Sequence, residues 1–179
     1  MAKELNIICF SAHFDTDAID FLEDLNCPAY KIASFEITDL ELISKAARTQ
    51  KPIIISTGIA EISDIKLAVE TCKKVGNHNI ILLKCTSAYP TPMEEVDLLS
   101  MQILGDKFDC LYGLSDHTIG NIVPLASLGL GSTSISRPAM PKDTPALAKS
   151  SAWSPLPPAA VFPWPGSWRE WVTSKIIGH

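Results

Sequence analysis

The sequence predicts an α/β protein with a parallel sheet of about five strand–helix units. Short apolar runs, such as Ile80 to Leu83, recur roughly every 22 to 31 residues, with helix-period segments between them. These runs lack the polar alternation of a half-exposed strand, which is typical of strands buried on both faces of a parallel sheet. Each run also ends in polar residues. Because the carboxyl ends of parallel strands share one edge, these residues are expected to form a single rim.

Five strands are predicted from the apolar runs. The fourth run leads from Asn79 to Pro90 and Pro92, and it stops there because proline cannot continue strand pairing. Right-handed crossover helices are expected to join neighbouring strands. The predicted strands lie near residues 5–11, 29–33, 52–57, 79–86 and 110–114.

Helices are predicted between the strands and after the last one. Gly76 is expected to end the third helix, because glycine readily adopts the left-handed conformation that closes a helix. Further helical segments are predicted near 96–104 and over 121–130, the latter with Pro124 in its first turn. The expected N-terminal caps are Asp15 or Thr16, Thr38 or Asp39, and Ser63.

The composition limits the class of function. The 179 residues carry a formal net charge of −5 and no basic stripe, which argues against a nucleic-acid partner. No segment reaches transmembrane length and no signal peptide is evident, so we expect a cytoplasmic protein without a membrane partner. No cysteine pair has metal-ligand spacing, and buried free thiols are expected. The cysteines are Cys9, Cys27, Cys72, Cys85 and Cys110.

The chain changes character after about Gly131. All four tryptophans and eight of the thirteen prolines lie in 132–179, without a helical or strand period. We therefore expect a barrel-like domain over 1–131 and a Pro/Trp-rich tail over 132–179 that has no packed core of its own. A proline-rich binding tail is one interpretation. A change of reading frame or a misjudged gene end explains the abrupt break better.

The predicted rim gathers side chains capable of binding and catalysis. Lysine and short hydroxyl groups at neighbouring strand ends can surround a phosphate with charge-assisted hydrogen bonds. A lone histidine at a strand end, such as His117, is more often structural than a metal ligand. The rim residues are His13, Lys31, Ser34, Glu36, Ser56, Thr57, Lys84, Ser87, Tyr89, Ser115, Asp116 and His117.

Four linked motifs resemble the sialic acid synthase family, including its pseudaminic and legionaminic acid synthases. They are YKIASFEITD (30–39), PIIISTG (52–58), LLKCTSAYPTP (82–92) and GLSDHT (113–118). The resemblance runs from about Leu5 to Gly131. It implies a TIM (β/α)8-type barrel, which is incomplete here because eight units need about 250 residues. It also implies a small antifreeze-like domain that closes over the neighbouring subunit's site, and homodimers among complete relatives.

The resemblance implies condensation of phosphoenolpyruvate with an N-acetylated amino sugar, giving a sialic-type nonulosonic acid and phosphate. Lys31 resembles the phosphate-binding lysine of the family, with Ser34 and Ser56 as hydroxyl donors beside it. Ser115 resembles a donor to the substrate carboxylate. For Lys31 the alternative is an ordinary surface lysine, but it lies within an apolar run.

The resemblance also implies a divalent metal, Mn or Mg, that polarises the sugar aldehyde. His117 resembles one of two metal-binding histidines, and Asp116 is expected to orient it. The second histidine, in a Glu-Lys-His-Phe motif, has no counterpart after Gly131. Glu36 is either a polar residue of the site or the partner of the site lysine.

The sugar end of the site is less distinct. Ser87 and Tyr89 resemble sugar-pocket residues, although a tyrosine before proline can also be a packed loop anchor. Lys84 is a weaker candidate, because the family does not always keep lysine there. Ala12 stands where relatives have a hydroxyl, and His13 stands where they have proline.

Two other classes of function remain open. Lys84, at the end of a barrel-like strand, could form a Schiff base in a class I aldolase or lyase. The chain could also be an inactive, truncated family member that keeps the motifs without the complete barrel.

Overall fold

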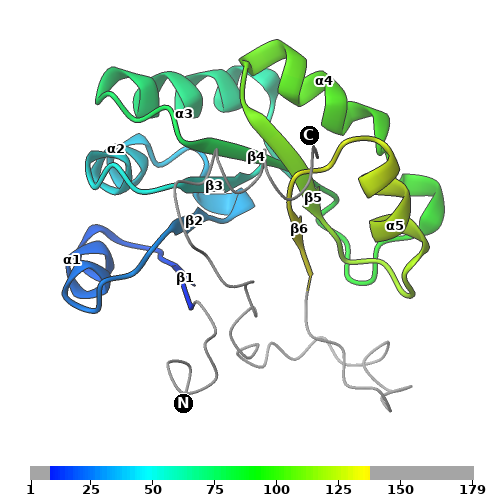
Figure 1. Ribbon diagram of the computed structural model, residues 1–179, viewed down its shortest axis with the longest axis horizontal. Coiled ribbons are helices and arrows are strands. Elements are labelled where there is room, and N and C mark those ends of the chain that lie inside the picture. The colour runs from blue at the N-terminus through cyan, green and yellow to red at the C-terminus, as the bar shows by residue number, and fades with distance from the viewer. Residues whose placement is uncertain (1–8, 138–179) are drawn as a thin grey trace, which may run out of the picture.

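The computed structural model describes residues 9–137, which fold around one parallel sheet (Figure 1). The sheet has six strands in the order β1-β2-β3-β4-β5-β6, and every neighbouring pair is parallel. Their bounds are β1 Ser11–Ala12, β2 Tyr30–Ile32, β3 Ile53–Ser56, β4 Ile80–Cys85, β5 Leu111–Ser115 and β6 Ile135–Ser136. The parallel α/β prediction is therefore confirmed.

A helix follows each of the first five strands. The α-helices lie on one side of the sheet, with α1, α2 and α3 over β1 to β4, and α4 and α5 beside β5 (Figure 1). Their bounds are α1 Thr16–Asp24, α2 Leu40–Arg48, α3 Ile62–Lys74, α4 Leu99–Phe108 and α5 Ile122–Gly129. Two short 3₁₀ helices, η1 Ser34–Glu36 and η2 Met93–Glu95, follow β2 and β4.

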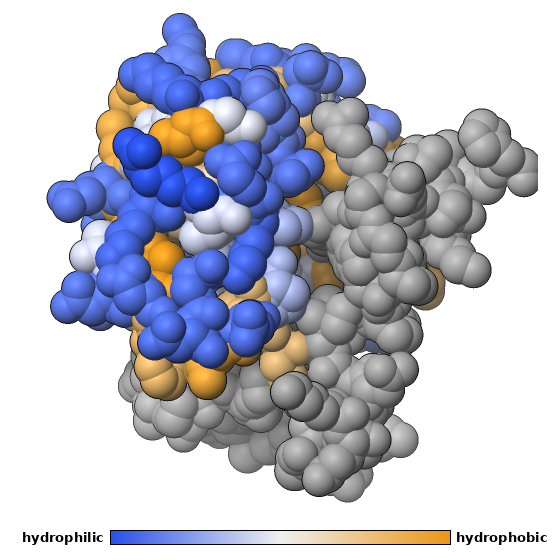
Figure 2. All heavy atoms as spheres, turned by 60° about the vertical axis from the view of Figure 1, so that its left-hand side comes forward, coloured by the Kyte–Doolittle hydropathy of each residue, from blue (hydrophilic) through white to orange (hydrophobic). Residues whose placement is uncertain are grey.

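The main core lies between the sheet and its helices. It joins alternate strand residues, such as Ile32 and Ile55, to helix residues such as Leu42 and Val69. Burial of such aliphatic side chains stabilises a fold by roughly 1.5–3 kcal/mol each. The outer surface of these helices is mostly hydrophilic, with scattered apolar areas (Figure 2). The helices are therefore amphipathic covers of the sheet.

A second apolar cluster lies on the opposite face of the same strands. It consists of Ile54, Ile81 and Leu83, with Phe10 and Leu111 packed against it. Successive side chains of a strand point to opposite faces. We call this second surface the inner face, since it corresponds to the interior of a barrel.

Local signals explain where the helices begin. Asp15 accepts a hydrogen bond from the Ala18 amide, and Asp39 accepts one from the Leu42 amide, as predicted for N-caps. The third helix differs from the prediction: Glu61, not Ser63, precedes it. Glu61 and Asp64 form a capping box, in which each side chain bonds the other's backbone amide.

Each helix ends in a left-handed turn that leads into the next strand. The residues with positive φ in these turns are Asn26, Gln50, Gly76, Asp109 and Gly131, with φ between 50° and 83°. Gly76 is the helix stop that the sequence predicted. Because all strands are parallel, the five turns lie at the end of the sheet opposite the rim.

Some boundaries differ from the prediction. The described part of the first strand is only Ser11–Ala12, and residues 1–8 lie outside the described residues. The helix expected near 96–104 begins at Leu99. The sheet also continues past Gly131, because β6 pairs with β5. Most of the predicted tail, 138–179, lies outside the described residues. None of the helices in the described part is long and apolar enough to cross a membrane.

Candidate active site at the carboxyl rim

The carboxyl ends of β2 to β5 bring three predicted site residues together with Cys85. Strand pairing sets Lys31 beside Ile54, Ser56 beside Leu83, and Cys85 beside Ser115. Paired residues of neighbouring parallel strands share a face. Lys31, Ser56, Cys85 and Ser115 therefore all lie on the inner face, above the apolar cluster.

Lys31 is a half-buried cation at this face. Burial lowers the pKa of its ammonium group, whereas the Cys85 thiol and the Glu36 carboxylate act in the opposite direction. Within residues 9–137 the Lys31 Nζ has no hydrogen bond or salt bridge. A desolvated cation of this kind is best compensated by an anion.

Gly58, just after β3, lets three polar side chains approach its backbone closely, and we call this arrangement the Gly58 cradle. Its amide donates to Ser34 Oγ at 3.0 Å, which fixes the serine hydroxyl at the end of β3. A Cβ atom at position 58 would lie 2.5 Å from Ser87 Oγ, 3.0 Å from Ser34 Oγ and 3.2 Å from Cys85 Sγ. Two hydroxyls and a thiol therefore converge on space that only glycine leaves free.

Two buried polar atoms, one at the end of β3 and one in the η1 helix after β2, have no partner within the described residues. Ser56 Oγ is buried and unbonded, and so is Oε2 of Glu36. Buried polar groups are normally hydrogen-bonded, so each exception calls for an explanation. A ligand oxygen accepting from Ser56 would satisfy the hydroxyl. Glu36 lies close enough to Lys31 to influence its pKa, but no salt bridge joins the two within 9–137, so their predicted pairing stays a prediction.

His117 lies between β4 and β5 at the rim. Its Nδ1 is 3.2 Å from the Thr86 carbonyl and 3.9 Å from Cys85 Sγ, and its Nε2 is 3.5 Å from Ser115 Oγ. The ring of Tyr89 stacks on it with 4.2 Å between centroids. The structure therefore brings His117, Ser115 and Tyr89 together, as expected for one site.

Cys85 is a central residue that the sequence reasoning treated only as a buried thiol. Burial alone would raise the pKa of this thiol, but contacts with His117, Ser115 and Ser34 outweigh burial and lower it. All five cysteines are free, and Cys9 is exposed rather than buried. The sequence could have revealed this position, because side chains two residues apart in a strand point to the same face and Cys85 follows Leu83 by two residues.

Lys84 and Asp116 lie on the other face of their strands. Lys84 pairs with Leu114, which packs against the helices, and its Nζ bonds the Cys85 carbonyl and Thr86 Oγ1, both at 3.2 Å. Lys84 and Asp116 line a small pocket together with Thr86, Thr118 and His117. Lys84 is therefore not part of the inner-face cluster, and its predicted role stays a prediction.

His13 does not reach the inner face either. It is 1% exposed, and its ring meets Tyr30 edge-on with 5.2 Å between centroids. Tyr30 belongs to the main core on the helix side. His13 is therefore a core residue.

The described residues do not by themselves fit a complete metal site. Within 9–137 no group of three His, Cys, Asp or Glu side chains could hold a metal ion. His117 can supply one nitrogen ligand, and its nearest polar neighbours are a carbonyl, a hydroxyl and a thiol. The predicted metal role of His117 therefore remains a prediction.

These features define the class of the protein. A parallel, helix-covered half-barrel with polar side chains at the carboxyl ends of its strands is the architecture of (β/α)8 barrels, whose sites lie at that end. Within that class the sequence profile of the NeuB family matches residues 1–139, and the chain belongs to the NeuB family. The family resemblance inferred from the four motifs is confirmed.

The proteins that this chain resembles are much longer than the part that matches it. It is 52% identical over 137 residues to the pseudaminic acid synthase of Helicobacter pylori, covering 76% of this chain and 40% of that protein. A spore coat polysaccharide biosynthesis protein of Bacillus subtilis superposes with a TM-score of 0.73 at 34% identity, covering 76% and 38% of the two chains. The N-acetylneuraminic acid synthetase of Leptospira borgpetersenii superposes with a TM-score of 0.71 at 32% identity, covering 76% of this chain and 47% of that chain. The chain thus spans about 40% of the length of the curated relatives it matches.

Proposed function

We propose that this chain forms the phosphoenolpyruvate-binding part of a NeuB-type synthase. The reaction joins phosphoenolpyruvate to an N-acetylated amino sugar and gives a nonulosonic acid and phosphate. Membership of the NeuB family and 52% identity to a pseudaminic acid synthase support this class of reaction. The observation that carries it is the half-buried Lys31, which forms no salt bridge within 9–137 and shares the inner face with the Ser56 and Ser115 hydroxyl groups.

The proposed phosphate position lies between Lys31 and the Gly58 cradle. Lys31 supplies the charge, and Ser34 and Ser56 supply hydroxyl donors, one of which is buried without a partner. Ser115, at the end of β5 and two strands beyond Ser56, would bind the carboxylate of the same substrate.

The bond changes follow from the substrates. The methylene carbon of phosphoenolpyruvate forms a bond to the aldehyde carbon of the open-chain sugar, whose oxygen takes up a proton. Water adds to the resulting cationic carbon and loses a proton, and the carbon–oxygen bond to phosphate breaks. In this proposal the described residues hold the phosphate and carboxylate during these steps, and Tyr89 and Ser87 would contact the sugar. A divalent metal, Mn or Mg, would activate the aldehyde, with His117 as one ligand.

A binding experiment tests the phosphate position. We expect Lys31→Met to weaken binding of inorganic phosphate and phosphoenolpyruvate by roughly ten- to a hundredfold, which corresponds to one charge-assisted contact of about 1.5–3 kcal/mol. Gly58→Ala should weaken both without removing charge, because its Cβ would fill the cradle. Titration calorimetry measures both ligands.

The matched control is Lys66→Met, which removes an exposed lysine from α3. It should bind both ligands like the wild type. Equal affinities of wild type and Lys31→Met would refute the phosphate position. Phosphate release from phosphoenolpyruvate with manganese and N-acetylmannosamine or a diacetamido relative tests the reaction itself, and loss of release in His117→Ala would assign it to this rim.

Borohydride trapping with pyruvate separates this proposal from the aldolase alternative. An imine-forming enzyme would be covalently labelled at Lys84, whereas the proposed condensation forms no imine. Labelling at Lys84 would overturn the proposal in favour of a Schiff-base aldolase or lyase.

A further inference from the structure

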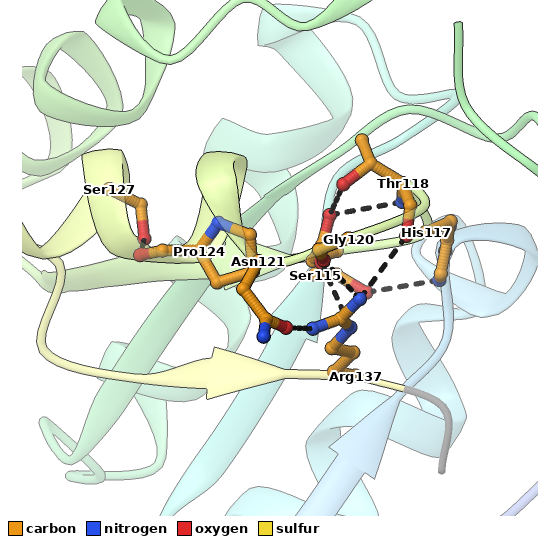
Figure 3. Close-up of polar contacts among 9 residues, drawn as sticks. Ser115, His117, Thr118, Gly120, Asn121, Pro124, Ser127 and Arg137 are labelled. Atoms are coloured by element: carbon orange, nitrogen blue, oxygen red, sulfur yellow. Dashed lines mark hydrogen bonds and ion pairs between the residues drawn. The ribbon is translucent and has the colours of Figure 1, made fainter. Parts of the chain in front are cut away.

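Arg137 joins the end of β6 to the loop between β5 and α5. Its Nη1 donates to Asn121 Oδ1 at 2.6 Å, and its Nη2 donates to the carbonyls of Thr118 and Gly120. Its Nε lies 3.2 Å from Asp116 Oδ2. Figure 3 shows the guanidinium group at the centre of these contacts, next to His117. One side chain thus touches four positions of a single loop.

Asp116 is the buried anchor of this loop. Its side chain is 0% exposed, and Oδ1 accepts from both the amide and the hydroxyl of Thr118, at 3.0 and 2.7 Å. Among residues 9–137 no group donates a hydrogen bond to Oδ2, and the ion pair with Arg137 compensates its charge. Removing one partner of a buried ion pair is strongly unfavourable, because the other charge is left uncompensated.

The two neighbours of Asp116 in the chain are the site residues Ser115 and His117. The Asp116 amide also donates to the Ser136 carbonyl at 2.8 Å, so β6 fixes the backbone at this point as well. Any rotation of the Asp116 peptide units would move both neighbours. The position of the carboxylate-binding serine therefore depends on contacts made by Ser136 and Arg137.

We propose that Arg137 is a positioning residue, which holds the 116–121 loop so that Ser115 and His117 point into the site. Within 9–137, Arg137 contacts none of the residues that are proposed to bind the substrate. The proposal rests on the proposed function for what Ser115 binds, but not for the loop contacts. An arginine suits this task because its planar fork donates in several directions at once, whereas a lysine ammonium is a point charge.

The experiment uses Arg137→Gln in the full chain and two readouts. Hydrogen exchange measures the loop, and we expect the Thr118 amide, bonded to Asp116, to exchange at least tenfold faster in the variant. Calorimetry then compares two probes. Phosphoenolpyruvate should bind roughly tenfold or more weakly, as one charge-assisted hydrogen bond is lost, whereas inorganic phosphate, held by Lys31, should bind unchanged.

Three further variants make the result specific. Arg137→Lys should recover part of the phosphoenolpyruvate affinity, since the ion pair with Asp116 remains possible. Arg48→Gln, which removes an exposed arginine from α2, should match the wild type in both readouts. Asn121→Ala removes a single contact of Arg137 and provides a milder test if Arg137→Gln fails to fold.

The outcomes distinguish the two proposals. Unchanged Thr118 exchange in Arg137→Gln overturns the positioning role. Faster exchange with an unchanged ratio of phosphoenolpyruvate to phosphate affinity also overturns it, because Arg137 would then stabilise the loop without affecting the site. A wild type that binds neither probe overturns the proposed function, and loop exchange then decides whether Arg137 holds the loop.

Discussion

His13 is a buried imidazole whose two ring nitrogens both lack a hydrogen-bond partner within 9–137. Burial lowers its pKa, and Asp15 opposes this only in part. A group with a lowered pKa in the folded state resists protonation there, while the unfolded chain takes up the proton below about pH 6.5. His13 should therefore make the fold sensitive to mild acid.

The first prediction follows with a definite sign. Above the unfolded pKa of about 6.5, His13 is neutral in both the folded and the unfolded chain, so its titration does not change the free energy of unfolding. As pH falls below that value, we expect the free energy of unfolding to decrease by up to about 1.4 kcal/mol per pH unit from this residue. His13→Phe keeps an aromatic ring against Tyr30 and should remove this dependence.

Urea unfolding at pH 7.5 and pH 5.0 measures the effect. The matched control is His78→Gln, in an exposed turn before β4, which should behave like the wild type. An identical loss of stability in His13→Phe and wild type would show that other groups cause the acid sensitivity.

At the residue scale, the sequence predicted the chemistry of the rim better than its geometry. Ser56 could be predicted because it ends an apolar run and Lys31 because it lies within one, and the family motifs supplied their roles. Which face a strand end presents depends on register, which the apolar run alone did not reveal. For this reason Lys84 was expected in the same cluster as Lys31, and Cys85 was overlooked.

Among the elements, the helix–strand turns share one backbone device. Gly76 and Gly131 adopt positive φ at little cost, but Asn26, Gln50 and Asp109 have side chains in a conformation that L-residues disfavour. Asparagine and aspartate tolerate it better than most residues. These turns therefore retain some strain that glycine would relieve.

The second prediction uses one substitution at two sites of α4. Asp109→Gly, at the left-handed position with φ 50°, should raise the free energy of unfolding by about 0.5–1 kcal/mol. Asp106→Gly, at an exposed position inside the helix, should lower it by roughly 0.3–0.5 kcal/mol, because glycine is a poorer helix former. Urea unfolding measures both, and equal signs would contradict the strain argument.

The elements themselves were predictable where an apolar run or a cap defined them. Strands β2 to β5 were found within one or two residues for this reason. Strand β6 was missed, because Ser132 to Arg137 contains one aliphatic residue, and its pairing depends on backbone bonds to β5, such as Leu114 to Ser134. The N-cap of α3 was predicted wrongly as Ser63, because the cap is Glu61, which forms a capping box with Asp64.

At the scale of the whole molecule, the outer surface of α5 is unusually apolar. Ile122, Leu125 and Leu128 are 74%, 66% and 51% exposed, while the buried side of the helix includes Ser127, bonded to the Pro124 carbonyl. Charge repulsion between molecules opposes contact through such a surface, and the formal net charge is −5 at pH 7.

The third prediction concerns solubility. Solubility should be lowest near pH 5.3, where the net charge vanishes and the apolar surface is no longer offset. Leu125→Lys should raise solubility at the isoelectric point of the variant, because it interrupts the α5 surface. Leu67→Lys, which adds the same charge at a half-exposed leucine of α3, should raise it less. Equal gains would indicate that charge alone controls precipitation.

The left-handed turns and the rim occupy opposite ends of the same strands, and this separation has a consequence for how the protein can vary. A replacement at Asn26 or Asp109 changes how firmly a helix is joined to its strand without touching Lys31 or Ser115. A replacement at the rim alters recognition without loosening a turn. Thermal stability and substrate recognition can therefore change independently, the first through the turn positions and the second through the rim positions.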